Sequence, residues 1–518
     1  MSRIDAAEPT ADHEKTDTEK LVLSRETGFG HEVYQESDLI AGTYTVPRLV
    51  DKLASVQQRA STFRWVIAAI ALILLGEQSA FATLLYTPIL GDLQAKFHAN
   101  NILWVITVGT LVGGACLPVI GKLGDRFGKK TVILVAVTIA SIGCALCAVT
   151  NNYGVFLVGR SLSGVSNGFL ILAIPLVREV FPPRSRQLVV SVAYGGTGLV
   201  TILGPLLSGW LVQVWDVTAP IWFQLVLGVI VGVLIAFLVP ESPLRNRAKV
   251  GFLNAALIGL GATSLSYGIS QLGMYSWGSW QVLVFIIAGI ALLLGWWAHS
   301  QVSKAPLVSP ALFKQRSLVG TVFSFSLVGA AAVAVLLLMT VAWETPKGAA
   351  PYAQGLDALQ LAFWMIPYAC CVTATGFIVG STAHKVGYRN YMFIGAAFGV
   401  VGSVVLAFVL TASPLVLILL FPLAALSYLS GSAAQPLLLL ASPPDQRSSV
   451  LAIGSSFTAL LIGILAQVGY AILGSTGASL SGYRTALLVM AGISLVGGLF
   501  AFMITHGRRN SGVIAIDH

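Results

Sequence analysis

The ten residues GKLGDRFGKK, Gly121–Lys130, stand between two long apolar segments at 101–120 and 131–149. Their glycines let the backbone turn tightly and approach other segments closely, because glycine carries no Cβ. Asp125 can accept hydrogen bonds from helix-end N–H groups and can meet neighbouring arginines. The pattern therefore predicts a short basic turn that joins two helices.

Composition places those two helices in a long series. The chain has 518 residues, of which 56% are hydrophobic and 10% charged, whereas a soluble domain has about 25% charged residues. A helix needs about 20 apolar residues to cross a bilayer core of about 30 Å. An all-α polytopic membrane protein is therefore predicted. Its fourteen transmembrane helices are expected at 64–90, 101–120, 131–149, 154–177, 187–213, 219–239, 251–272, 281–298, 317–343, 357–380, 390–411, 414–440, 447–474 and 485–505.

Lys and Arg are distributed unequally between the two sides of these segments. Sixteen fall in loops on the side of the amino terminus, and three, Lys96, Lys347 and Arg484, fall on the other side. Such an excess marks the cytoplasmic side of a membrane protein. We therefore expect both termini in the cytoplasm. The formal charge of +9 follows from this topology and indicates no nucleic-acid partner.

The first 62 residues differ from the rest of the chain. They contain eleven acids and seven bases and no long apolar run, which predicts a mostly disordered cytoplasmic tail. Near its end, Leu49, Leu53 and Val56 are spaced as on one face of an amphipathic helix that could lie on the inner leaflet. An unstructured linker is the alternative. Residues 506–518 are expected to form a second cytoplasmic tail.

A second, degenerate copy of the basic loop follows at 380–389, where Gly387 aligns with Gly128 and His384 replaces Asp125. Internal duplication is how many transporters are built. The two loops occupy equivalent places in two six-helix bundles. We expect these bundles at 63–240 and 301–505, with two inserted transmembrane helices at 241–300.

Three motifs resemble those of the major facilitator superfamily. The first basic loop is similar to the family's loop between its second and third helices, at Gly121, Gly124, Asp125, Arg126, Gly128, Lys129 and Lys130. The segment LVGRSLSGVSNG, Leu157–Gly168, resembles the family's buried-arginine motif, with Arg160 as the arginine. The segment GGTGLVTILGPLLSG is similar to the helix motif of antiporter members, at Gly195, Gly204, Pro205 and Gly209.

Fourteen spans together with these motifs resemble the drug:proton antiporter branch of that superfamily. The resemblance implies a fold of two rocking six-helix bundles, and a monomer in a bacterial cytoplasmic membrane. It implies a small-molecule substrate and protons as the transported species. It also implies that Gly204, Pro205 and Gly209 bend and thin their helix where the two halves meet. No cofactor is expected.

The candidate proton-binding residue is Glu77, near the middle of the first apolar segment. A charge at this depth costs about 2.5 to 3.5 kcal/mol on insertion scales, so it is rarely present without a use. An apolar pocket disfavours the ionised carboxylate, and the proton can leave when water or a cation arrives. The alternative is a carboxyl that snorkels or bonds to the backbone. In the antiporter branch the acid of the first helix stands about two positions from the place of Glu77. It precedes a proline that corresponds to Pro88.

Arg160 is expected beside the same central cavity, as an electrostatic neighbour of Glu77 rather than its fixed partner. A purely structural bridge between helices is the alternative. Substrate contacts are expected from Gln78, Asn167, Trp364 and Tyr368, each of which has a packing or anchoring role as its alternative. Spans nine to fourteen hold no acid at mid-membrane depth, which favours a neutral or monovalent amphipathic substrate over a dication.

Two other functions remain open at this point. Proton-coupled uptake of a nutrient or organic solute would use the same fold, and PESP at Pro240–Pro243 echoes the loop after the sixth helix of sugar porters. A non-transporting membrane sensor or a membrane enzyme is disfavoured. The sequence contains no HExxH metal motif and no GxxxxGK nucleotide loop. Because these motifs are absent, we expect no enzyme. All five cysteines fall inside predicted spans, so we also expect no metal site and no disulfide.

Overall fold

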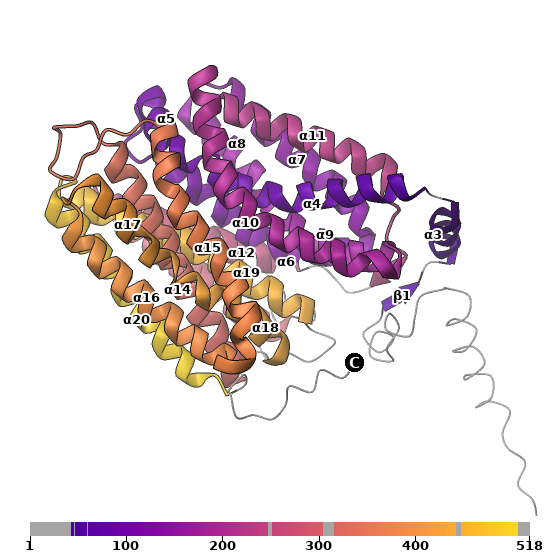
Figure 1. The fold of residues 1–518 in the computed structure, drawn as a ribbon. Coiled ribbons are helices and arrows are strands. Elements are labelled where there is room, and N and C mark those ends of the chain that lie inside the picture. The colour runs from indigo at the N-terminus through magenta and orange to yellow at the C-terminus, as the bar shows by residue number, and fades with distance from the viewer. Residues whose placement is uncertain are drawn as a thin grey trace, which may run out of the picture.

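A computed structural model describes residues 43–45, 47–59, 61–246, 251–303, 315–441 and 447–505. Residues 1–42 of the predicted amino-terminal tail at 1–62, and the predicted second tail at 506–518, lie outside the described residues. Within the described part the chain is almost entirely helical (Figure 1). The helices before the inserted pair are α3 (Pro47–Arg59), α4 (Thr62–Leu84), η1 (Thr87–Ile89), α5 (Leu90–Phe97), α6 (Trp104–Phe127), α7 (Lys129–Val149), α8 (Tyr153–Ser163), η2 (Gly164–Gly168), α9 (Phe169–Val180), α10 (Pro183–Val214) and α11 (Ala219–Leu238).

The remaining helices follow in the same manner. The inserted pair is α12 (Phe252–Gln271) and α13 (Trp280–Val302). The later helices are α14 (Arg316–Glu344), α15 (Ala358–Val386), α16 (Tyr388–Val409), α17 (Pro414–Ala425), α18 (Tyr428–Ala441), α19 (Arg447–Ser475), α20 (Leu480–Phe500) and η5 (Ala501–Met503). Among the described residues, thirteen helical segments are long and apolar enough to cross a membrane. In α10, the described apolar stretch, Val200–Val214, is shorter than these thirteen segments.

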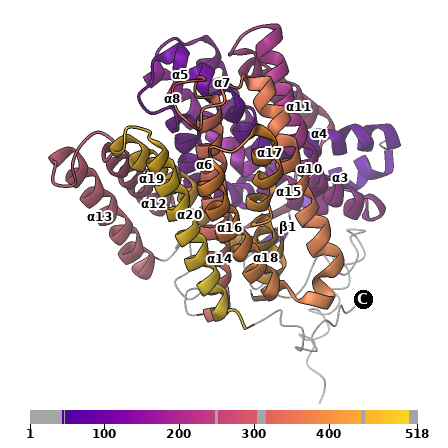
Figure 2. The same ribbon diagram turned by 60° about the vertical axis from the view of Figure 1, so that its left-hand side comes forward.

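The helices pack as two halves with the inserted pair on one side. One buried apolar cluster draws only on α3 to α11, and two others draw only on α14 to η5. The halves meet where α6 packs against α19 and α10 against α15. Helices α12 and α13 form a hairpin, of which α12 contacts α6 and α19 while α13 lies at the edge of the molecule (Figure 2). We call α4–α11 the N-terminal half and α14–α20 the C-terminal half.

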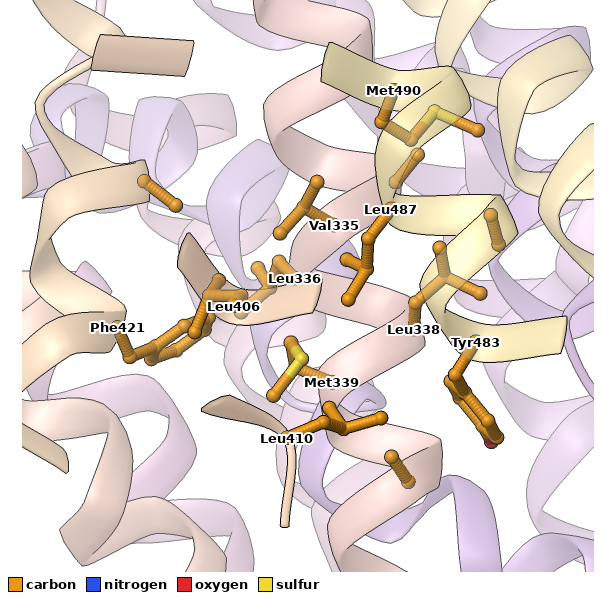
Figure 3. Packing of buried hydrophobic residues seen from close by; sticks show 14 of the residues in the cluster. Val335, Leu336, Leu338, Met339, Leu406, Leu410, Phe421, Tyr483, Leu487 and Met490 are labelled. Carbon is orange, nitrogen blue, oxygen red and sulfur yellow. The ribbon is translucent and has the colours of Figure 1, made fainter. Parts of the chain in front are cut away.

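The core of the C-terminal half surrounds α14. Leu406 of α16 and Phe421 of α17 approach Leu336 from one side, and Leu487 of α20 lies on the other side (Figure 3). Trp343 near the end of α14 is 1% exposed, and its ring packs against Phe421 with centroids 5.0 Å apart. Apolar side chains from four helices thus make α14 the central helix of its half.

Part of the predicted amino-terminal tail is folded, which corrects the linker alternative for residues 47–59. Helix α3 buries Leu53 to 1% exposure against the N-terminal half, and Gln57 donates to the Val180 carbonyl at 2.8 Å. The apolar side of α3 therefore packs on protein. Immediately before it, β1 (Thr43–Thr45) pairs antiparallel with β2 (Leu244–Asn246). The chain was expected to be all-α, and these two short strands are the exception among its described residues.

Two predicted spans are interrupted near their middle, and both are the fourth span of their half. The first divides into α8 and α9 at η2, whose sequence GVSNG combines two glycines with residues of low helix propensity. The second divides into α17 and α18 at Leu426–Ser427. Pro422 inside α17 has no N–H to donate to the preceding turn. Matched breaks in repeated halves are a pointer to a transport site.

The turn before the third span also repeats in the two halves. Gly128 has φ 107° and ψ 136°, and Gly387 has φ 90° and ψ 135°. Each glycine follows the last residue of one helix and precedes the first residue of the next. This left-handed conformation favours glycine, since a Cβ would be strained there. The predicted correspondence of the two loops thus extends to their backbone.

Candidate functional site

A layer of polar side chains crosses the apolar interior of the N-terminal half. One apolar cluster contains Ala68–Leu75 of α4 and extends toward the end of the molecule that carries Gly121–Lys130, which we call the basic end. Another contains Phe81–Leu93 and lies toward the opposite end, which we call the far end. Polar side chains on α4, α6, α7, α8, η2 and α11 lie between these two clusters in sequence. We call them the polar layer: Glu77, Gln78, Thr107, Thr110, Ser141, Arg160, Ser163, Ser166, Asn167 and Gln224.

Glu77 is the carboxylate of this layer. Its side chain is buried, with 3% of the residue exposed, and neither carboxylate oxygen has a hydrogen-bond partner among the described residues. Buried polar groups are nearly always paired, so each unpaired one needs an explanation. Leaving an ionised carboxylate in this state would be very costly. The alternative in which Glu77 bonds to the backbone does not apply to this structure.

Spacing along α4 shows which way Glu77 faces. Phe81 and Leu84 follow it at i+4 and i+7, and therefore lie on the same face of the helix. Both approach Gly204 of α10, where an added Cβ would stand 3.3 Å from the Leu84 Cβ and 3.7 Å from the Phe81 ring. Glu77 thus lies one turn nearer the basic end on the face of α4 that contacts α10. The side chains of α10 at 190–199 lie outside the described residues.

Arg160 joins three helices inside the same half. It is 2% exposed, and its guanidinium donates to the carbonyls of Val105 on α6 and Ala82 on α4, at 2.9 and 2.8 Å. It also donates to Ser163 at 3.1 Å, and its guanidinium carbon lies 3.8 Å from the centre of the Tyr86 ring. Ala82 is five residues after Glu77 on α4, and the Glu77 carboxyl is not among the described partners of the Arg160 guanidinium. The contacts fit the structural-bridge alternative.

The four expected substrate contacts are not brought together. Gln78 lies between α4, α7 and α11, where its amide comes within about 3.4 Å of the place that a Gly228 Cβ would occupy. Asn167 in η2 donates to the Gly109 carbonyl at 3.4 Å. Trp364 and Tyr368 lie in the other half, packed on Trp343 and Phe421 with ring centroids 5.3 and 4.5 Å apart. These positions correspond to the packing alternative for both aromatic residues.

The basic loop has different partners from those expected for it. Asp125, in the last turn of α6, meets Lys129 at 3.2 Å. The helix-end N–H groups of Lys130 and Thr131 instead donate to the carboxylate of Glu241, both at 3.0 Å. The reason is geometric, because the Asp125 side chain faces the residue at i+4 while Glu241 approaches the start of α7 from another loop. Negative charge at a helix N-terminus is stabilising.

Lys129 links this loop to the end of the fourth span. It is buried, and its ammonium group lies 2.7 Å from Glu179 of α9, which also accepts a hydrogen bond from Ser242. Sequence reasoning missed Glu179 and Glu241 as members of this site. A usable signal was present in both cases, since each is an acid beside a predicted span end that faces a basic loop.

The antiporter-type motif contributes differently at its separate positions. A Cβ at Gly209 would stand 2.6 Å from the Leu359 Cα of α15, so this glycine permits the two halves to touch. Gly204 faces α4 of its own half, which differs from the expected position between the halves. Pro205 lies inside α10. The surroundings of Gly195 lie outside the described side chains.

The family model described as Major Facilitator Superfamily matches residues 66–466. The chain belongs to this superfamily. Residues 66–466 thus form a major facilitator domain, a multi-pass membrane fold of secondary transporters rather than of enzymes. Membership agrees with the motif resemblances and with the duplicated halves.

Curated relatives and solved structures place the chain within the superfamily only broadly. It is 29% identical over 299 residues to an uncharacterised MFS-type transporter of Mycobacterium tuberculosis, a match covering 57% of this chain and 42% of that protein. It is 24% identical over 319 residues to the multidrug transporter protein MdtP of Bacillus subtilis, covering 59% and 55%. The chain thus spans about half the length of these curated relatives. The POT family transporter PepTSo shares the fold, with a TM-score of 0.61, 14% identity and coverage of 84% and 97%.

Proposed function

We propose that this major facilitator protein is a proton-coupled antiporter that exports neutral or monovalent amphipathic molecules. In this proposal α10 also crosses the membrane, which brings the number of spans to fourteen. The basic end and both termini face the cytoplasm. The two halves rock about the level of the polar layer and expose it alternately to the two sides. The protein acts as a monomer in a cell membrane.

One observation carries the proposal, and it is the unpaired carboxyl of Glu77. Both of its oxygens lack partners in the part of the chain that the structure describes, within a buried layer at mid-height of the N-terminal half. Such a group is stable there with a proton bound and becomes stable without it only when water or a cation reaches it. A change of conformation that hydrates the layer would therefore release the proton.

The surroundings of Glu77 support a coupling role in a second way. Arg160 donates to the Ala82 carbonyl on α4 and to the Val105 carbonyl on α6, and it contacts Tyr86. Its guanidinium is thus occupied by neutral acceptors rather than by the Glu77 carboxyl. The proton can thus be exchanged without breaking an ion pair. Similarity to MdtP, a multidrug transporter protein, supports export as the direction.

The test is a flux assay with purified protein in liposomes, in which a pH gradient drives accumulation of a monovalent amphipathic dye. Glu77→Gln keeps the shape of the side chain and removes the exchangeable proton. We expect it to abolish accumulation driven by the gradient while dye binding is retained. The matched control is Asp51→Asn, which neutralises an exposed carboxylate on α3.

Two outcomes would contradict the proposal. Undiminished antiport by Glu77→Gln would remove this residue from the mechanism. Movement of solute in the same direction as the protons would replace export by uptake. Equal loss of flux in the Asp51→Asn control would show that the assay reports membrane insertion rather than coupling.

A further inference from the structure

Hydrogen bonds between described residues of the two halves lie at the far end. They connect the segment from η1 to the start of α6 with the ends of α14 and α19, where α6 and α19 lie side by side (Figure 2). Four such bonds join described residues: Asn101 Nδ2 to Gln467 Oε1 at 2.7 Å, Gln467 Nε2 to Thr107 Oγ1 at 2.9 Å, Tyr470 OH to the Asn100 carbonyl at 2.7 Å, and Gly91 N to Glu344 Oε2 at 2.8 Å.

We propose that Gln467 is the hub of a latch that holds the far end of the transporter closed. Its amide uses both ends, since the oxygen accepts from Asn101 and the nitrogen donates to Thr107. It is fully buried, at 0% exposure, as is Thr107. Gln467 belongs to α19 of the C-terminal half, and both of its partners belong to the N-terminal half. Opening the far end must therefore break both bonds together.

The partner residues are held in position before the latch closes on them. The Asn101 side-chain oxygen accepts from the Leu103 N–H at 3.2 Å, which orients its NH₂ group toward Gln467. The Asn101 carbonyl accepts from the Tyr153 hydroxyl at 2.6 Å, which ties the same residue to α8. Preorganised groups lose little freedom when they form a contact, so the contact contributes more to the closed state.

A second contact lies one turn farther along α19. Tyr470 follows Gln467 at i+3, so the two side chains share a face of the helix. Its hydroxyl donates to the carbonyl of Asn100, the residue before Asn101. Two adjacent residues of the N-terminal half are thus held from one face of α19. Neither Gln467 nor Tyr470 is charged at neutral pH, so the latch bonds themselves take up and release no proton.

The test uses a single-cysteine reporter at the junction of the halves. Leu337 of α14 is fully buried in a cluster that contains residues of both halves. On a background without the five native cysteines, Leu337→Cys reports opening by its rate of reaction with a water-soluble maleimide in lipid nanodiscs. Gln467→Ala should raise that rate by about tenfold or more, because it removes two buried hydrogen bonds from the closed state.

Controls make the result specific. Gln213→Ala removes an exposed glutamine near the far end of α10 and should leave the rate unchanged. Asn101→Ala should raise the rate, and the double variant Asn101→Ala/Gln467→Ala should add little to Gln467→Ala, since the two residues share one bond. If Gln467→Ala does not fold, the rate in Asn101→Ala tests the latch by itself, because this variant removes one of the two bonds of Gln467.

An unchanged rate in both Gln467→Ala and Asn101→Ala would overturn the latch. Strict additivity in the double variant would also overturn it, because it would show that the two side chains act separately. The readout needs no pH gradient and no transported substrate. Failure of the latch and failure of the Glu77 proposal are therefore distinguishable.

Discussion

The two halves share a fold and differ in what crosses their middle. In the N-terminal half the layer between the apolar clusters contains a carboxylate, three amides and an arginine: Glu77, Gln78, Asn167, Gln224 and Arg160. In the C-terminal half the corresponding described side chains are hydroxyls: Ser326, Thr375, Ser403, Ser427 and Ser494. No carboxylate, amide or arginine lies between the two clusters of the C-terminal half among its described residues.

The hydroxyls of the C-terminal half are largely satisfied by their own helices. Ser403 donates to the Gly399 carbonyl at 2.7 Å and Ser427 to the Ala424 carbonyl at 2.6 Å. In contrast, Glu77 and two amides of the N-terminal half, Gln78 and Gln224, retain unpaired polar atoms. The C-terminal half also has unpaired buried polar atoms among its described residues, at Ser324, Trp343, Tyr368 and Ser456, but these are hydroxyls and indole N–H groups. An unpaired carboxylate and unpaired amides occur in the N-terminal half and not in the described C-terminal half. The polar layer of the N-terminal half is where binding of a proton or a substrate would change the energy most.

The largest effect on stability is expected at Arg160. Arg160→Met removes a buried cationic donor shared by carbonyls on α4 and α6 and takes from the Ala82 carbonyl, in the last turn of α4, its side-chain partner, at a cost on the order of 3 kcal/mol. We expect a clear fall in thermal unfolding temperature in detergent. Arg160→Lys keeps the charge but loses the several N–H donors of the guanidinium. Its unfolding temperature should therefore lie between those of the wild type and Arg160→Met. A stable Arg160→Met protein would mean that the N-terminal layer is held together without its arginine.

An intermediate effect is expected in the basic loop, where the halves can be compared directly. Glu179→Gln leaves the buried Lys129 with Asp125 alone, whose side chain is about half exposed. We expect transport to slow by roughly tenfold, because the buried charge loses its closest partner. Asp125→Asn should slow it only a few-fold, as expected for a solvated pair.

Substrate affinity is the control for the loop variants. The loop lies at the basic end, away from the polar layer, so dissociation constants should be unchanged while turnover falls. His384→Asn in the second copy of the loop replaces the residue aligned with Asp125 and should have little effect on either quantity. A selective loss of affinity in Asp125→Asn would contradict a purely conformational role for the loop.

The smallest effects are expected from the hydroxyls of the C-terminal half. Ser403→Ala and Ser494→Ala remove groups that lie in a closely packed apolar setting. A hydroxyl bonded to its own helix contributes little net free energy, about 1 kcal/mol or less. Both variants should transport at close to the normal rate in the liposome assay. Loss of proton coupling in either variant would remove the asymmetry between the two layers.

Much of the architecture followed from the sequence for a simple reason. In lipid each helix must satisfy its own backbone, so long apolar segments mark spans without any knowledge of their neighbours. The loop Gly121–Lys130 and its copy at 380–389 also appear locally, as glycines and bases at fixed spacing. The burial of Glu77 could be predicted because a carboxylate is conspicuous in an apolar run.

Features that depend on distant partners could not be predicted. Pairing of β1 with β2 joins residues about 200 positions apart, and neither strand has a distinctive pattern. Glu241 replaces Asp125 at the start of α7 because of how its loop folds back, which the sequence does not reveal. The amides of Gln78 and Gln467 look alike in sequence, yet one lies inside a half and the other joins the halves.

The most direct measurement of the central claim is infrared difference spectroscopy of the carboxyl C=O stretch in the reconstituted protein. The account predicts a protonated-carboxyl band that is lost when substrate binds or when the far end opens, and that is absent from Glu77→Gln. A wild-type spectrum without that band, or a band that persists in Glu77→Gln, would contradict it.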